Sequence, residues 1–176
     1  MTTTPQQIRP ELKYGLIAGS GVALWFFCEY LLGLHTTRLA LGEYTGRFSS
    51  LVLLLAVLTL LKKQQAAFGP LFTLRRGLWS GLFMSLIAST VIYIFMAVYG
   101  RFINPDWIRA ALDWKVVQLR AAHVTEEKIR EYITFYRDTN NAAGLLYSTL
   151  TNWTLQGGLM SLLLTFWLIW RGQKAK

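Results

Sequence analysis

The stretch Gly77–Tyr99, GLWSGLFMSLIASTVIYIFMAVY, decides the fold class of this chain. It holds 23 residues and no Asp, Glu, Lys or Arg. A helix of about 20 mostly apolar residues crosses the hydrocarbon core of a bilayer, which is roughly 30 Å thick. The composition and length of this stretch therefore predict a transmembrane helix over residues 77–99.

Three further segments have the character of membrane spans. Residues 14–34 carry one charge, Glu29, and residues 147–170 carry none. Only 15% of the whole chain is charged, whereas soluble domains have about 25% charged residues. The sequence therefore predicts an all-α protein, an integral membrane four-helix bundle in which residues 1–176 form a single membrane domain.

The remaining span is the least regular of the four. Its uninterrupted apolar core, residues 51–61, is too short to cross a bilayer alone. Extending the helix back to Tyr44 gives a span over residues 44–61 and places Arg47 in its first turn. A long basic side chain at that depth can reach the lipid headgroups while its stem stays in apolar surroundings.

The distribution of charge predicts how the chain is oriented. Four spans place both termini on the same side as the loop between spans two and three, and the flanks on that side hold nine basic residues and one acid. The loop over residues 100–146 holds seven basic and six acidic residues. Basic residues in short flanks mark the cytoplasmic side. We therefore expect an inner-membrane protein with cytoplasmic N- and C-termini and a periplasmic loop 100–146, and the net charge of +9 needs no nucleic-acid partner.

This long loop contains two helix-start patterns. Asn104-Pro105-Asp106 is typical of an N-cap followed by Pro at the first helical position. Thr125-Glu126-Glu127 places acids at the positive end of a second helix dipole. The sequence therefore predicts an extramembrane helical hairpin over residues 105–138. It is either a simple connection between spans three and four or a lid that binds a partner or ligand.

Several short motifs together suggest a family. They are Lys13-Tyr14-Gly15-Leu16 at the start of span one, Phe102-Ile103-Asn104-Pro105-Asp106 after span three, and Thr125-Glu126-Glu127-Lys128-Ile129 in the hairpin. With these motifs the chain resembles family 4199 of the domains of unknown function, a group of bacterial four-span membrane proteins, over nearly its whole length. The resemblance implies an integral membrane protein of Gram-negative bacteria and carries over no catalytic motif.

Motifs for common chemistries are missing from the sequence. It has two histidines and one cysteine, and none of them has the spacing of metal ligands. No nucleophile elbow and no phosphate-binding glycine loop occurs. We therefore expect no enzyme activity, no metal, no cofactor and no nucleic-acid partner.

The polar residues inside the spans are the candidate site. Glu29 is the main one, because an ionisable residue within a span is by default a functional hypothesis. Three interpretations stay open: an ion pair between Glu29 and Arg47, a proton or cation site, and a carboxylate solvated near the interface. Asn152 and Gln156 are four residues apart and so share a helix face. They predict either interhelical hydrogen bonds or a polar pocket open to the outside.

Small residues recur every four positions in three spans, which allows close approach of helices. The favoured function is a non-enzymatic accessory or assembly protein that meets a partner through its hairpin or these small-residue faces. The alternative is a small transporter or ligand-binding membrane protein. The expected partners are the lipid bilayer and either a membrane protein or a second copy of the chain. The small residues are Gly15, Gly19 and Ala23, then Gly77, Gly81 and Ser85, and finally Gly157 and Ser161.

Overall fold

The protein is all-helical over residues 9–174, the part of the chain that this computed structural model describes. Four long helices alternate with shorter ones, and no strand occurs in the described range. The elements in chain order are α1 (Pro10–Leu31), α2 (Leu39–Thr45), α3 (Phe48–Phe68), η1 (Gly69–Leu71), α4 (Leu74–Val98), η2 (Tyr99–Ile103), α5 (Trp107–Ala121), α6 (Glu126–Asn140) and α7 (Ala142–Lys174).

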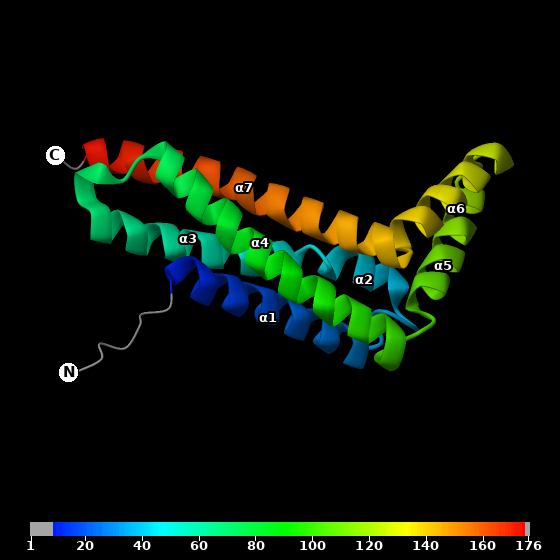
Figure 1. Ribbon diagram of the computed structural model, residues 1–176. Coiled ribbons are helices and arrows are strands. Elements are labelled where there is room, and N and C mark those ends of the chain that lie inside the picture. The colour runs from blue at the N-terminus through cyan, green and yellow to red at the C-terminus, as the bar shows by residue number, and fades with distance from the viewer. Residues whose placement is uncertain (1–8, 175–176) are drawn as a thin grey trace.

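Helix α4 is the centre of the bundle. It packs most extensively against α7 and then against α1, while α3 contacts both α1 and α7. Figure 1 shows these four helices as an elongated bundle, with α5 and α6 at one end and directed away from it. The start of α1, the η1 turn and the end of α7 lie toward the opposite end (Figure 1).

The prediction of four membrane spans is confirmed at the level of helix length and composition. Each predicted span overlaps a helical stretch that is long and apolar enough to cross a membrane. Many of the large apolar side chains on these stretches are exposed, as expected for a surface that faces lipid tails. The four stretches are Pro10–Leu31, Leu39–Leu71, Leu74–Ile103 and Ala142–Gly172.

The span boundaries differ most around the first connection. Helix α1 ends at Leu31, three residues before the predicted end, because the chain turns through Gly33 at a φ of +73°. The second span is also interrupted, since the short helix α2 precedes α3 and the two are separated at residues 46–47. The additional helix, α2, lies beside the end of the bundle that carries α5 and α6 (Figure 1).

The small residues of the spans lie at contacts inside this bundle. A Cβ atom on Gly19 of α1 would lie 2.8 Å from the Ala88 backbone oxygen of α4. A Cβ on Gly81 of α4 would overlap Ser161 of α7, and one on Gly157 of α7 would overlap Ser85. The helices approach so closely only because these positions lack a side chain. The predicted small-residue faces are thus used within one chain.

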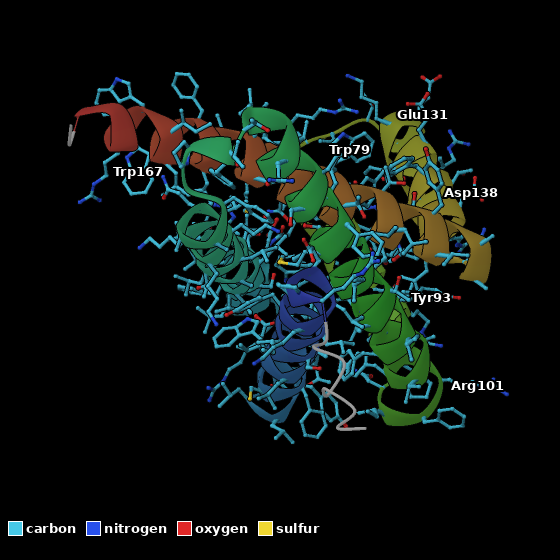
Figure 2. All side chains as sticks on the ribbon, turned by 60° about the vertical axis from the view of Figure 1, so that its left-hand side comes forward. Trp79, Tyr93, Arg101, Glu131, Asp138 and Trp167 are labelled. Atoms are coloured by element: carbon cyan, nitrogen blue, oxygen red, sulfur yellow. The ribbon has the colours of Figure 1, made fainter. Side chains whose placement is uncertain are left out.

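Helices α5 and α6 form the hairpin that the sequence predicted between spans three and four. Leu112 of α5 and Ile129 of α6 are its buried residues. Arg120 joins the two helices through a hydrogen bond from its Nε to the Glu126 carboxylate, 2.9 Å long. Figure 2 shows Glu131 and Asp138 on the outer surface of α6.

Candidate functional site

Glu29 occupies a buried position in the last turns of α1. Its side chain is only 1% exposed, although it is ionisable and the turns of the helix around it are apolar. Oε2 lies 3.4 Å from His35 Nε2, which is within ion-pair reach. Neither carboxylate oxygen has a hydrogen-bond partner. Burying a carboxylate without hydrogen-bond partners costs free energy, so a buried Glu at this position is unusual.

An ion pair with Arg47, one of the three interpretations that the sequence left open for Glu29, does not occur in the structure. The chain leaves α1 at Leu31, turns at Gly33 and brings His35 back over the last turns of the helix, where it faces Glu29. Arg47 lies beyond the additional helix α2 and is exposed. Because of this turn and the additional helix, the neighbour of Glu29 is His35 and not Arg47.

His35 connects Glu29 to a second buried group. Its Nδ1 lies 2.8 Å from the hydroxyl of Tyr99, which is fully buried at the start of η2. The same hydroxyl accepts a hydrogen bond of 3.0 Å from Asn104 Nδ2. The four side chains form a continuous line of polar groups, the Glu29–His35–Tyr99–Asn104 cluster.

Local backbone structure positions the far end of this cluster. Element η2 is a π-helical turn. Such turns are rare in proteins, and those that occur are often found at functional sites. The Asn104 backbone N–H donates to the Tyr99 carbonyl oxygen at 2.9 Å, which brings the two side chains together. The prediction of Asn104 as the N-cap of the hairpin is therefore wrong, because α5 begins at Trp107 and the Asn104 amide is used by Tyr99.

Aromatic rings enclose the cluster. Tyr30 and Trp107 meet Tyr99 edge to face, with ring centroids 5.7 Å and 6.0 Å from it. Phe95 stacks on Tyr99 at 5.8 Å. The Trp107 indole N–H is buried and has no hydrogen-bond partner. Aromatic rings thus surround polar atoms that lack hydrogen-bond partners: one donor, the Trp107 indole N–H, and two acceptors, the Glu29 carboxylate oxygens.

A pocket of about 250 Å³ opens next to His35. It lies between α2 and the hairpin, so its walls come from three separate helices. Lys115 bridges it by an ion pair of 3.0 Å with Glu43. The side chains around it are largely apolar or aromatic: Leu34, Leu39, Trp107, Ala111, Trp114, Tyr132 and Tyr136.

The other predicted site residues lie apart from this cluster. Gln156 of α7 donates from Nε2 to Ser50 Oγ of α3 at 2.7 Å, so it forms an interhelical hydrogen bond. Asn152 is exposed on α7. Among the described residues, no hydrogen bond or ion pair joins any two of Glu29, Arg47, Asn152 and Gln156.

Sequence reasoning found Glu29 but missed the partners that surround it. His35 is one of only two histidines, and its place just after the first span was the available signal. Tyr99 was only the last residue of the third predicted span, and Asn104 fitted a helix cap. The cluster offers a carboxylate, an imidazole and a phenol, which can bind a ligand or exchange a proton. Within residues 9–174, no group of three or more His, Cys, Asp or Glu side chains could hold a metal ion.

Comparison with known proteins gives the family of the chain. No curated protein and no solved structure matches it significantly. Residues 13–168 match the family described as "Protein of unknown function (DUF4199)". That match covers most of α1 and α7 and the whole of α3, α4, the hairpin and the Glu29–His35–Tyr99–Asn104 cluster. The chain therefore belongs to the DUF4199 family.

Proposed function

We propose that the protein is a multi-pass protein of a bacterial inner membrane, with both termini in the cytoplasm and the α5–α6 hairpin in the periplasm. The charge distribution supports this orientation, because basic residues in short flanks mark the cytoplasmic side. The basic residues of the η1 region and of the end of α7 belong to the bundle end opposite the hairpin (Figure 1). They are Lys62, Lys63, Arg75, Arg76 and Arg171.

In this orientation, the protein binds a small, largely apolar ligand with a basic group in the pocket between α2 and the hairpin, and does not transform it. One observation carries the proposal: the buried Glu29 carboxylate has no hydrogen-bond partner and lies behind His35, a wall of the pocket. Aromatic walls with a carboxylate nearby suit a ligand cation. This is the ligand-binding function that the sequence offered as its alternative.

A pocket-filling variant tests the proposal. Ala111 lines the pocket, whereas its neighbour Ala110 does not, so Ala111→Phe fills it and Ala110→Phe is the matched control. The full chain in detergent is heated with small aromatic and aliphatic amines, and with carboxylic acids of the same size. A saturating amine is expected to raise Tm by about 5 °C. This rise should appear in the native chain and the control but not in Ala111→Phe. Equal shifts with amines and acids, or in all three chains, would contradict the proposal.

A second candidate is the accessory or assembly role that the sequence favoured. The observation behind it is the outer face of the hairpin, where Phe135 is 67% exposed and Val117 is 65% exposed. Large apolar side chains at such exposure are suited to contact with a protein partner. The partner would be another membrane protein or a second copy of the chain.

Crosslinking in intact membranes tests the accessory role. A photoreactive residue is placed at Phe135, at Val117 and, as the control, at Arg137, which is exposed on the same helix as Phe135 but two residues away and so on another face. Capture of one membrane protein, or of the chain itself, from both apolar positions and not from Arg137 would support the role. Equal capture from all three positions, or none, would contradict it.

A further inference from the structure

A second cavity lies at the opposite end of the bundle. It is open, has a volume of about 1010 Å³, and is separate from the pocket beside His35. The start of α1, the end of α3, η1 and the start of α4 form its walls. Neither the candidate site nor the proposed function uses this region.

Three hydrogen-bonded polar residues line the cavity: the half-buried Glu11 and the buried Gln64 and Ser80. Glu11 Oε1 accepts hydrogen bonds from Gln64 Nε2 at 2.6 Å and from Ser80 Oγ at 2.7 Å. Only the NH₂ group of the Gln64 amide can donate to a carboxylate, so its orientation is fixed by this contact. Gln64 is 7% exposed, and its Oε1 is buried without a partner. This acceptor therefore lies beneath the cavity surface and lacks a donor.

The rim of the cavity is strongly basic. Arg9, Arg75 and Arg76 line it, and Glu11 is the one carboxylate among the lining residues. Arg75 and Arg76 also lie in the first turn of α4, where the helix dipole adds positive potential. Guanidinium groups at such a site favour a phosphate, with which they form charge-assisted hydrogen bonds.

One side of the same cavity is apolar and faces outward. Trp79 and Phe83 line it, are four residues apart on α4, and are 63% and 48% exposed. Leu71 of η1 is 72% exposed beside them. Because α4 is long and apolar enough to cross a membrane, these residues would lie against lipid tails. A ligand in this cavity thus meets basic and apolar surfaces together.

We propose that this cavity binds an anionic glycerophospholipid through its headgroup. The phosphate lies against Arg75 and Arg76, and the acyl chains run along Trp79 and Phe83. Soluble phosphate esters also carry a phosphate, but only a lipid also covers the apolar side of the cavity. The arginines and the helix N-terminus attract the anion, and the exposed apolar side holds the acyl chains.

Native mass spectrometry of the full chain released from detergent tests the proposal. Phosphatidylglycerol and phosphatidylcholine are supplied in equal amounts, and one phosphatidylglycerol is expected to be retained at least tenfold more than phosphatidylcholine. Arg75→Gln should weaken its retention by about tenfold through the loss of a charge-assisted contact. Lys62→Gln is the matched control, because Lys62 is an exposed cation on α3 that does not line the cavity.

A competition experiment distinguishes a bound lipid from a bound soluble anion. Millimolar inorganic phosphate or glycerol phosphate should leave the bound phosphatidylglycerol in place. Displacement by either would overturn a lipid site in favour of a soluble anion site. Equal retention of the two lipids would overturn the proposal, because it would show binding that does not depend on the headgroup charge. Equal weakening by Arg75→Gln and Lys62→Gln would overturn it as well, because it would show general attraction to a basic surface.

Discussion

At Glu29, one carboxylate is held in an apolar helix by a partner only six residues further along the chain. The contact requires the turn at Gly33, which returns His35 toward α1. Glu29 could be chosen as a candidate site residue from the sequence, because it is an ionisable residue within a span, and this choice required no knowledge of its neighbours. The identity of its partner depended on how the backbone leaves α1, and no pattern of charge or apolarity in the sequence encodes that path.

Substitution of Glu29 separates its charge from its volume. Glu29→Gln keeps the shape of the side chain and is expected to change the free energy of unfolding by less than about 1 kcal/mol. Glu29→Ala leaves a cavity and is expected to cost about 2–4 kcal/mol. Thermal unfolding of the full chain in detergent measures both. In the ligand panel, Glu29→Gln should lose the preference for amines, and an unchanged preference would remove Glu29 from the proposed function.

The hydroxyl of Tyr99 is expected to stabilise the end of the bundle near the hairpin. Tyr99→Phe leaves Asn104 Nδ2 and His35 Nδ1 without their shared partner in a buried region. This loss should cost about 1–3 kcal/mol. Tyr147→Phe is the control, because Tyr147 is 74% exposed on α7. Equal unfolding free energies for the two variants would show that the cluster adds no stability.

Between elements, the contact of α1 with α4 depends on missing side chains. A Cβ on Gly19 would lie 2.6 Å from Val91 Cβ and 2.8 Å from the Ala88 oxygen, and a backbone oxygen cannot move aside. Gly19→Ala is therefore expected to destabilise the bundle by about 1–3 kcal/mol. Gly172→Ala, whose Cβ would come no closer than 3.6 Å to Gln65, should be neutral in the same unfolding assay.

The attachment of the hairpin is expected to weaken at alkaline pH. Burial raises the pKa of Tyr136 on α6 above its ordinary value of about 10, and the neighbouring Tyr132 adds to the shift. The protonated Tyr136 hydroxyl therefore contributes fully to stability below the ordinary pKa of tyrosine. This contribution is lost as the pH rises through the higher pKa of Tyr136 in the folded state. Tryptophan fluorescence between pH 9 and 12 measures the change. Tyr136→Phe should remove most of it, and an identical pH profile would exclude Tyr136 as the cause.

For the whole molecule, the proposed orientation makes a direct prediction. A reporter enzyme that is active only in the periplasm should be inactive when fused after Lys176, and active when inserted at the α5–α6 connection near His123. The physical reason is the excess of basic residues in the short flanks at the termini. The opposite pattern of activity would reverse the orientation and place the pocket beside His35 in the cytoplasm.

The four long helices and the two hairpin helices were predictable because they depend on local composition. The charge-free stretch 77–99, for example, can satisfy its backbone in a bilayer only as a helix. Span ends were less predictable, since the break at residues 46–47 and the turn at Gly33 depend on single backbone conformations. The same holds for α5, whose start moved to Trp107 because Asn104 is bound to Tyr99.

The sequence by itself determined an all-helical chain with four apolar helices and a connecting hairpin, and it singled out Glu29. Apolarity, charge and helix-start residues act over a few neighbouring positions, so they can be read directly from the chain. Only the tertiary structure decided that Glu29 faces His35, that Tyr99 and Asn104 continue the polar cluster, and that three basic side chains share a cavity with Gln64. These groupings join residues from different helices, and helix packing fixes their distances.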